Sequence, residues 1–231
     1  MFCDVYRSMR KPVLKLFCLL LCVFSLGGCG QRPGGKTPES RAPESQTQGS
    51  ERLGVLSYET GDAGVTITGC DAAAEGEVVI PDEIAGLPVT SIGFEAFFGC
   101  RDLTSIIIPE GITSIGDKAF GVCSSLTSIT IPEGVSSIGE GAFIGCSGLT
   151  SITIPDGVVS IGGVAFYECY SLTSISIPDS VTSIGAGAFN DCTGLNSITI
   201  PKAFHSDEEA WRIGIQSLWP DGFALPDSSS K

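Results

Sequence analysis

Apolar residues recur along this chain at a fixed spacing of 23 residues, and polar residues separate them. The first copy reads Ile92-Gly93, Ala96-Phe97, Cys100, Leu103 and then Ile106-x-Ile108-Pro109. Four further copies follow without a gap, at residues 115–132, 138–155, 161–178 and 184–201. A unit this short cannot bury its own apolar face, so the copies must stack into a solenoid with one continuous core.

Within one copy, the alternation of apolar and polar residues predicts two short extended segments and two turns. Residues 106–108 are expected to form a parallel strand, and residues 89–92 a second extended segment that ends at Gly93. Ala96-Phe97 is expected to form a single helical or 3₁₀ turn on the opposite wall. Pro109-Glu110-Gly111 reverses the chain, because proline presets φ and glycine accepts the positive φ that ends the turn. The predicted fold class is therefore an α/β-type repeat solenoid with short parallel strands.

Stacking places each repeated residue on its equivalents in the neighbouring coils. The repeated phenylalanines are predicted to fill the core, and the repeated cysteines to lie there as buried free thiols. These residues are Phe97, Phe120, Phe143, Phe166 and Phe189, with Cys100, Cys123, Cys146, Cys169 and Cys192. Coils joined by parallel strands lie about 4.8 Å apart, outside the range of about 3.5–4.5 Å between Cβ atoms that a disulfide requires. The alternative is a disulfide between Cys70 and Cys100, which requires a distorted first unit.

The end of the chain has the pattern of a capping helix. Ser206 and Glu209 have the spacing of a capping box, and apolar residues follow at helical spacing. We expect a helix over residues 207–218 whose apolar face covers the last coil. The residues expected to form this cover are Trp211, Ile215, Leu218, Trp219 and Phe223.

The repeat also resembles a known family. Leu126-Thr-Ser-Ile129-Thr-Ile131-Pro132, followed by Val135-Ser-Ser-Ile138-Gly139 and Ala142-Phe143-x-x-Cys146, is similar to the BspA-type leucine-rich repeat. The resemblance extends over residues 55–203, and residues 65–89 resemble the irregular first unit that opens such arrays. It implies a surface-exposed bacterial protein that is built for binding rather than for catalysis.

The start of the chain has the layout of an export signal. Arg10 and Lys11 precede an apolar run over residues 13–24, which is short for a membrane-spanning helix. Leu26-Gly27-Gly28-Cys29 then resembles a bacterial lipobox, which implies lipid attachment at Cys29. Cys29 is followed by Gly30. An aspartate at this position would favour retention at the inner membrane, so the glycine leads us to expect an outer-membrane or cell-surface location. Met9 gives a more compact signal peptide than Met1 and is our hypothesis for the initiator.

These patterns divide the chain into five parts. Residues 30–51 are rich in Pro, Gly, Ser, Glu and Gln and contain no large apolar side chain, a composition that cannot offset the entropy of ordering. The predicted parts are a signal peptide (1–28), a lipid-anchored disordered linker (29–51), an N-terminal capping unit (52–88), five 23-residue repeats (89–203) and a C-terminal cap and tail (204–231).

Charge excludes one class of partner. Without residues 1–28 the chain has nine basic and 25 acidic residues. Between Thr90 and Pro201 the basic residues are Arg101 and Lys118, so no wall can present the cationic stripe that phosphate backbones require. We therefore expect no nucleic-acid partner.

Two sets of polar residues repeat with the coils. An acidic residue follows the turn proline, at Glu110, Glu133, Asp156 and Asp179. The favoured interpretation is a solvated polar turn; the alternative is calcium bound between adjacent coils, although the Gly-Gly-x-Gly-x-Asp loop of calcium-binding solenoids is missing. Ser and Thr also form columns on the outer face of the predicted strands, at positions that repeat between residues 105 and 199. The favoured interpretation is a soluble surface, and the alternative is an ice- or mineral-binding array.

Residues that vary between copies are better candidates for a specific contact than residues that repeat. Phe94, Phe98, Tyr167 and Tyr170 are large apolar groups with no role in the repeated core. Exposed aromatic side chains are typical of recognition surfaces, so we predict that they bind a partner. The alternative is that they only cover the outer wall.

Catalytic chemistry has little support in the sequence. His205 is the single histidine, and its neighbours Ser206 and Asp207 cannot form a triad geometry at a helix start. We interpret His205 as a solvent-exposed residue of the cap and expect no cofactor and no enzymatic activity. Two functions remain: a surface adhesion module for protein or glycan partners, and a structural spacer whose copies associate with each other.

Overall fold

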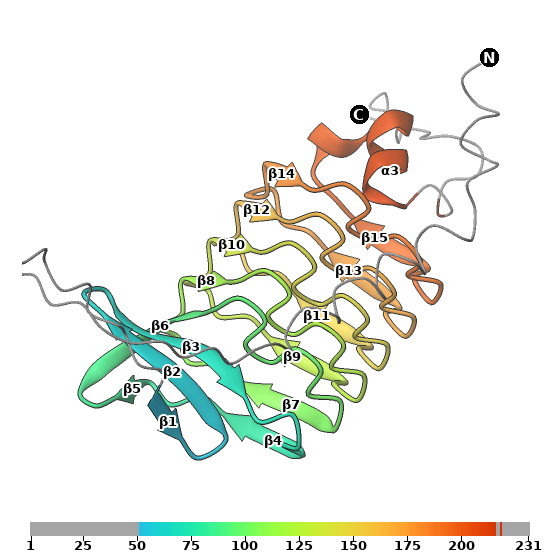
Figure 1. The fold of residues 1–231 in the computed structure, drawn as a ribbon. Helices are drawn as coiled ribbons and strands as arrows, with labels where there is room; N and C mark the ends of the chain where they lie inside the picture. The colour runs from blue at the N-terminus through green and yellow to red at the C-terminus, as the bar shows by residue number, and fades with distance from the viewer. Residues whose placement is uncertain (1–50, 216–217, 219–231) are drawn as a thin grey trace, which may run out of the picture. The chain divides into compact units, whose positions relative to one another are not determined.

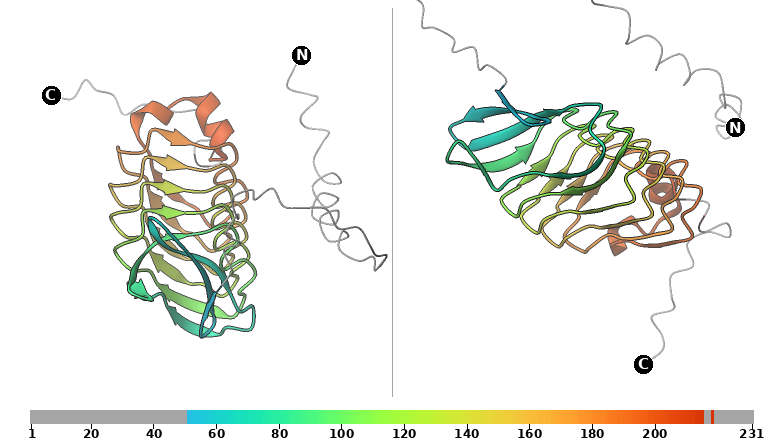
Figure 2. Two further views of the ribbon diagram at one scale, coloured as in Figure 1. Left: turned by 60° about the vertical axis from the view of Figure 1, so that its left-hand side comes forward. Right: turned by 90° about the horizontal axis from the view of Figure 1, so that it is seen from below.

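The computed structural model describes residues 51–215 and residue 218. In these residues the chain winds into a solenoid, and each coil contributes to three walls (Figure 1, Figure 2). Two of the walls consist of short strands, and the third consists of turns. The predicted stacking of 23-residue units into a solenoid is confirmed.

The first wall is a sheet that runs the length of the solenoid. Its repeated strands are parallel and in register, so that Ile115 pairs with Ile92 on one side and Ile138 on the other. These isoleucines point inward and are buried, since side chains alternate across a strand. The strands are β6 (Leu87–Ile92), β8 (Ser114–Ile115), β10 (Ser137–Ile138), β12 (Ser160–Ile161) and β14 (Ser183–Ile184).

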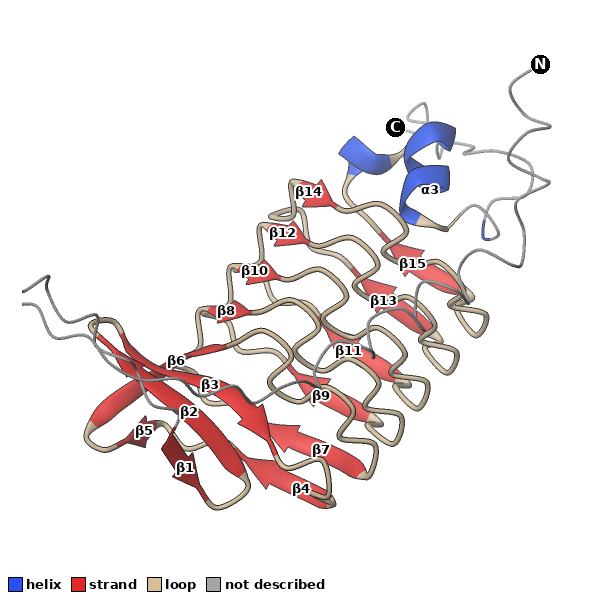
Figure 3. Cartoon of the chain, viewed as in Figure 1, coloured by secondary structure: helices blue, strands red, loops and turns tan. Residues whose placement is uncertain are grey.

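The second wall contains the strands that the Ile-x-Ile pattern predicts. Ile129 pairs in parallel with Ile152, and backbone bonds such as Thr127 N–H to the Thr104 carbonyl (3.3 Å) continue the wall between strand pairs. Figure 3 shows the strands of both walls in red. The strands of the second wall are β4 (Gly76–Val79), β7 (Leu103–Ile107), β9 (Ser128–Thr130), β11 (Ser151–Thr153), β13 (Ser174–Ser176) and β15 (Ser197–Thr199).

The turn wall, formed by residues 93–102 and their equivalents in later coils, has a hydrogen-bond ladder of its own. The Phe120 amide donates to the Ala142 carbonyl at 2.8 Å, and the Phe143 amide donates to the Ala165 carbonyl at 2.8 Å. Bonds between residues three apart, such as Cys100 N–H to the Phe97 carbonyl at 3.2 Å, close each turn. The turn expected at Ala96-Phe97 is thus a hydrogen-bonded turn that does not continue into a regular helix.

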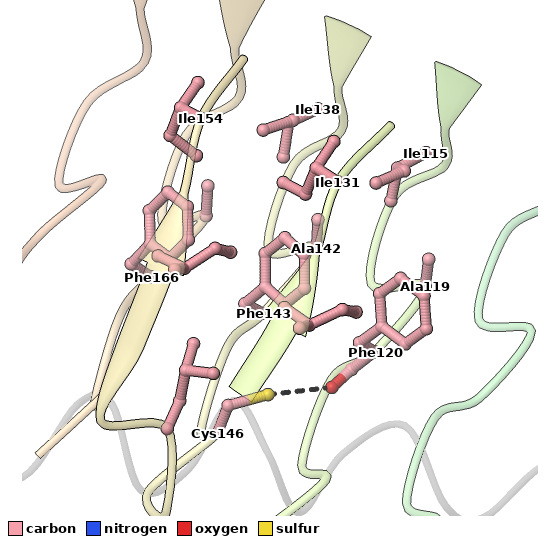
Figure 4. Packing of buried hydrophobic residues seen from close by; sticks show 14 of the residues in the cluster. Ile115, Ala119, Phe120, Ile131, Ile138, Ala142, Phe143, Cys146, Ile154 and Phe166 are labelled. Atoms are coloured by element: carbon pink, nitrogen blue, oxygen red, sulfur yellow. Dashed lines mark hydrogen bonds between the residues drawn. The ribbon is translucent and has the colours of Figure 1, made fainter. Parts of the chain in front are cut away.

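Phenylalanine rings form a stack along the axis of the core. Phe120 and Phe143 have ring centroids 5.3 Å apart and planes inclined by 10°. The pair Phe143 and Phe166 is closer to parallel, at 5.4 Å and 3°. Figure 4 shows Phe120, Phe143 and Phe166 in this stack, with Ile115, Ile131, Ile138 and Ile154 beside the rings. All five repeat phenylalanines are almost fully buried, and each of the three central rings is held between the rings of the two adjacent coils.

The repeat cysteines are free, buried thiols that also serve as hydrogen-bond donors. Cys146 Sγ donates to the Phe120 carbonyl of the preceding coil at 3.0 Å, and Cys169 Sγ donates to the Phe143 carbonyl at 3.3 Å. The expectation of small apolar groups therefore omitted one contact. From Cys123 onward, each repeat thiol stabilises a phenylalanine carbonyl group that lies inside the core.

Glycine in the repeats is required by contacts between coils. We predicted a positive φ at Gly111, but neither Gly111 nor its equivalent Gly157 lies in the left-handed region, so this prediction is wrong. A Cβ on Gly157 would lie 2.2 Å from the carbonyl oxygen of Glu133 in the preceding coil. A Cβ on Gly162, at the end of a first-wall strand, would lie 2.4 Å from the Glu140 amide nitrogen. Glycine at both positions lets successive coils approach.

The N-terminal end of the solenoid is closed by antiparallel strands. β2 pairs with both β1 and β3, and β3 joins the first wall in parallel with β6. Leu56, Val65 and Ile67 from these strands are buried and extend the core beyond the first repeat. The elements are β1 (Glu51–Leu53), β2 (Leu56–Gly61), β3 (Gly64–Cys70) and β5 (Glu83–Ile84), of which β5 pairs with β6.

The C-terminal end is closed by η1 (Lys202–Phe204) and α3 (Asp207–Ile213). Ser206 caps α3 by accepting a bond from the Glu209 amide at 3.2 Å, as predicted, but α3 ends at Ile213 because Gly214 adopts a left-handed φ of 92°. Within α3, Ile213 is buried in the core. Trp211 is 65% exposed, so its assignment to the apolar face is wrong.

The carbonyl groups at the end of α3 accept the last hydrogen bonds of the turn-wall ladder. The Gly187 amide donates to the Arg212 carbonyl at 2.7 Å, and the Phe189 amide donates to the Ile213 carbonyl at 2.8 Å. The last carbonyls of a helix have no partner inside the helix. They therefore replace the carbonyls that a further coil would have supplied.

The predicted signal peptide, Cys29, the linker up to residue 50, Trp219 and Phe223 lie outside the described residues. Within the described part of the chain, no helix has the length and apolar character needed to cross a membrane.

Candidate binding surface

The outer face of the second wall is uniform and polar. Ser128, Thr130 and Ser151 are exposed, as are their equivalents toward the C-terminus. Ile107 interrupts the threonine column and is 49% exposed. The face therefore offers hydroxyl groups in register, but it holds no concentration of charge or aromatic groups.

The acidic column lies at the turns that follow the second wall. Glu110, Glu133, Asp156 and Asp179 are all exposed, one on each of four successive coils. Among residues 51–215 and 218, no group of three or more His, Cys, Asp or Glu side chains is placed to hold a metal ion. The column is a charged edge of the solenoid.

Two of the predicted partner-binding residues lie near the N-terminal end of the turn wall. Phe94 is 63% exposed, and Lys118 Nζ lies 5.8 Å from the centroid of its ring. Lys118 also pairs with Glu95 across adjacent coils at 3.6 Å. One of the few basic side chains of the repeats is therefore already engaged by an aromatic ring and a carboxylate.

Phe98 belongs to a column of variable residues on the same wall. The position that follows the core phenylalanine holds Gly121 in the next coil, then Ile144 and Tyr167. A Cβ on Gly121 would lie 2.7 Å from the Phe98 ring and 3.1 Å from Ile144 Cγ2. Because Gly121 has no side chain, Phe98 and Ile144 approach each other over it and form an apolar strip.

Tyr167 and Tyr170 form a second aromatic patch in the fourth repeat. Both phenols make side-chain hydrogen bonds with Glu168, and Tyr167 also bonds with Asp191 of the next coil. Partial burial raises the pKa of Tyr167, and the nearby Glu168 and Asp191 carboxylates raise it further. The pKa of Tyr170 is raised for the same reasons, first burial and then Glu168. Both phenols therefore remain protonated donors at neutral pH.

The carboxylates of this patch were not predicted from the sequence. Glu168 and Asp191 adopt left-handed φ values of 60° and 59° at a position where Gly99 and Gly145 stand in other coils. Such a conformation disfavours residues with a Cβ, so glycine is the expected choice. The replacement of glycine by an acidic residue in two successive coils is the sequence signal that could have identified them. We call Tyr167, Glu168, Tyr170 and Asp191 the tyrosine–carboxylate patch.

His205 is placed differently from the prediction. Its ring is half-buried, and Nε2 lies 3.0 Å from the Ile200 carbonyl oxygen, so the expectation of a solvent-exposed residue is wrong. This bond fixes the chain between η1 and the last strand. Nothing in the described residues shows catalytic activity.

A further exposed region lies at the N-terminal edge of the second wall. The amide of Gly76 in β4 donates to the Asp102 carbonyl at 3.0 Å, and the amide of Ile80, just after β4, donates to the Ile107 carbonyl at 3.0 Å. Amides at alternate residues of this segment therefore face β7. Glu77, between them, therefore directs its backbone groups to the outer edge of the sheet. Beside this edge, Leu53, Val55 and Val79 line a shallow apolar hollow.

One protein family and several solved structures are similar to this chain. The sequence profile described as "BspA type Leucine rich repeat region" matches six copies of its repeat over residues 88–210. No curated protein sequence gives a significant match.

Several solved structures share the fold. A leucine-rich-repeat protein of T. pallidum is 35% identical, with a TM-score of 0.62 over 66% of this chain and 72% of that one. A leucine-rich repeat protein from Bacteroides ovatus is 36% identical, with a TM-score of 0.61 over 66% of this chain and 42% of that one. A leucine rich cell surface protein from Faecalibacterium prausnitzii is 33% identical, with a TM-score of 0.58 over 68% of this chain and 44% of that one. The chain thus matches less than half the length of the last two proteins.

The family profile covers more than half of the chain, and the period, the stacked core and the two capped ends agree with it. The chain belongs to the BspA-type leucine-rich repeat family.

Proposed function

We propose that the protein is a non-enzymatic binding module of the bacterial cell surface that contacts a protein or glycan partner through its turn wall. The observation that carries this proposal is the tyrosine–carboxylate patch. Hydrogen bonds with Glu168 in the same coil, and with Asp191 of the next coil, hold its two rings and two carboxylates together.

The chemistry of the patch supports both partner classes. Tyrosine combines a large apolar surface with a polar tip, which makes it frequent in the energetically dominant part of protein interfaces. The carboxylates can accept hydrogen bonds from sugar hydroxyls or from Arg and Lys side chains of a protein. The low number of basic residues in the repeats directs the proposal away from anionic partners.

The test is a binding screen of the purified protein against immobilised glycans and extracellular-matrix proteins. Tyr170→Ala removes the more exposed ring of the patch, and Phe94→Ala removes an exposed ring of the same wall outside it. We expect at least one ligand whose binding Tyr170→Ala weakens tenfold or more while Phe94→Ala leaves it unchanged. A screen without any ligand, or a ligand indifferent to Tyr167→Ala and Tyr170→Ala, would refute the proposal.

Cell-surface location through a lipid on Cys29 is part of the proposal. It is supported by the lipobox-like Leu26-Gly27-Gly28-Cys29 and by the description of the F. prausnitzii neighbour as a cell surface protein. Expression of Cys29→Ser in a bacterial host should move the protein from the membrane fraction to the soluble fraction without changing its unfolding transition. Retention of Cys29→Ser in the membrane fraction would contradict lipid attachment.

Self-association as an envelope spacer is the second candidate function, and the open edge of β4 favours it. Unpaired strand edges beside exposed apolar residues, here Val79 at 56% exposure, can pair with another chain. The charge of Glu77 opposes the approach of two such edges. Sedimentation with and without calcium should therefore detect dimers that become more stable in Glu77→Gln; a monomer in all of these conditions would exclude this function.

A further inference from the structure

Cys100 is the exception in the ladder of thiols. Cys123 Sγ donates to the Phe97 carbonyl at 3.1 Å, and the three cysteines that follow make the same bond one coil later each time. No repeat precedes Cys100, so no phenylalanine carbonyl is available to it. Its Sγ lies 3.7 Å from the Asp71 carbonyl oxygen and shares a side-chain hydrogen bond with Cys70.

The backbone of the cap holds these two cysteines together. Cys70 is the last residue of β3, and Asp71 N–H donates to the Val55 carbonyl at 2.8 Å. A few residues later, Gly76 N–H donates to the Asp102 carbonyl at 3.0 Å, so the segment from Cys70 to Gly76 runs beside Cys100. The fixed spacing between equivalent residues of stacked coils does not apply to this pair, since Cys70 is not at a repeat position.

The two thiols differ in exposure and in acidity. Cys70 is partly exposed, whereas Cys100 is buried. The hydrogen bond from Cys70 lowers the pKa of Cys100, and the same bond raises the pKa of Cys70. Burial raises the pKa of Cys123, Cys146 and Cys169. Among the described cysteines, only Cys100 has a lowered pKa, which favours its thiolate.

We propose that Cys70 and Cys100 are an oxidisable pair that forms a disulfide and fastens the N-terminal cap to the first repeat. The oxidant is a disulfide, RS–SR, of low molecular weight or in an oxidoreductase. The accessible Cys70 passes its proton to the Cys100 thiolate along their hydrogen bond and attacks RS–SR as the thiolate, which breaks the S–S bond and gives a mixed disulfide. The released sulfur takes this proton from Cys100 and leaves as RSH. The Cys100 thiolate then attacks the Cys70 sulfur and displaces the second RSH. Two thiols are oxidised, RS–SR is reduced to two RSH, and the two thiol protons end on the released sulfurs.

The bond would close a loop that includes β4, β5 and β6. This loop contains the open edge of the second wall and the strand that joins the cap to the repeats. Cross-linking its ends restricts the unfolded chain, and it also prevents the cap from opening away from the core of the first coil. Local opening starts most readily at the ends of a repeat array, where each unit has a neighbour on one side only.

Peptide mapping of the folded, full chain tests this proposal. The reduced protein is incubated with oxidised glutathione, the remaining thiols are alkylated, and proteolytic peptides are identified with and without reduction. We expect a cross-linked peptide pair containing Cys70 and Cys100, with Cys123, Cys146, Cys169 and Cys192 recovered as thiols. Oxidation should also raise the melting temperature by several degrees.

Three variants make the outcome decisive. Cys70→Ser and Cys100→Ser should each lose both the cross-linked peptide and the rise in melting temperature, whereas the matched Cys123→Ser should keep the cross-link. Cys70 recovered only as a glutathione adduct, Cys100 linked to Cys123, or both cysteines recovered as thiols would each overturn the proposal.

Discussion

The thiol of Cys146 donates a hydrogen bond to the carbonyl oxygen of Phe120, one coil earlier, at 3.0 Å (Figure 4). The Phe120 carbonyl also accepts the Cys123 amide at 3.4 Å. A single carbonyl inside the core thus connects two coils. Equivalent bonds from Cys123, Cys169 and Cys192 repeat this connection along the solenoid.

The buried thiol of Cys146 predicts a pH dependence of stability that one substitution should reduce. Burial raises the pKa of Cys146 well above its usual value, so the folded state keeps the thiol proton after the unfolded chain has lost it. The contribution of Cys146 to stability is therefore present below about pH 8.5 and is lost as the pH rises beyond that value. Between about pH 8 and pH 10, the unfolding free energy of Cys146→Ala should fall by about 2 kcal/mol less than that of the wild type. Urea titrations at both pH values test this, with Ser147→Ala as the control; an unchanged difference would contradict it.

Position along the stack should determine the cost of removing a core ring. Phe143 stacks between Phe120 and Phe166, whereas Phe189 stacks on Phe166 alone. Phe143→Ala should lower the unfolding free energy by about 3–5 kcal/mol. Phe189→Ala should loosen the last coil and α3, visible as faster hydrogen exchange there, with little change in the central coils. Equal loss of protection throughout the chain in both variants would argue against nearest-neighbour stacking.

Gly162 and Gly163 are adjacent but should respond differently to alanine. A Cβ on Gly162 would lie 2.4 Å from the Glu140 amide nitrogen, whereas a Cβ on Gly163 would be 3.3 Å from its nearest neighbour, the Ala186 carbonyl oxygen. Other coils also carry side chains at the second position, including Asp117 and Glu140. Gly162→Ala should cost about 2 kcal/mol or more through strain between coils, and Gly163→Ala less than about 0.5 kcal/mol. Thermal unfolding of the two variants provides the comparison.

Val164 offers a stabilising substitution. It adopts a φ of 49°, at a position where Gly141 and Gly187 stand in the neighbouring coils. Relief of this strain, about 1–3 kcal/mol, should exceed the entropy cost of glycine, about 0.5–1 kcal/mol. Val164→Gly should therefore raise the midpoint of urea unfolding, whereas the buried Val158→Gly should lower it. A lower midpoint for Val164→Gly would show that its side-chain contacts outweigh the strain.

The C-terminal cap should depend on Ile213 rather than on Trp211. Ile213 is fully buried, and its carbonyl accepts the Phe189 amide, whereas the Trp211 side chain faces solvent. Ile213→Ala should lower the unfolding free energy by about 2–4 kcal/mol, and Trp211→Ala should change it by less than about 0.5 kcal/mol. A larger effect of Trp211→Ala would restore the assignment made from helical spacing.

The 23-residue spacing predicted the solenoid because equivalent residues contact each other across a fixed step in the chain. Ile106, Ile129 and Ile152 fall in consecutive coils of one wall for this reason. The phenylalanine column and the free thiols follow from the same translation.

Contacts that depend on the position of the neighbouring coil could not be predicted from the sequence. The roles of Gly157 and Gly162 required the positions of the preceding backbone, and Trp211 was misplaced because α3 ends at Ile213. Glu168 and Asp191 become partners of Tyr167 only when two coils are stacked.

The sequence by itself determined the repeat, its stacking axis and the classes of residue in the core, because a periodic pattern encodes contacts between identical positions. The tertiary structure alone decided the contacts of residues that differ from coil to coil, among them Cys70 with Cys100 and Tyr167 with Asp191. Such contacts depend on distances between backbones that no single repeat contains.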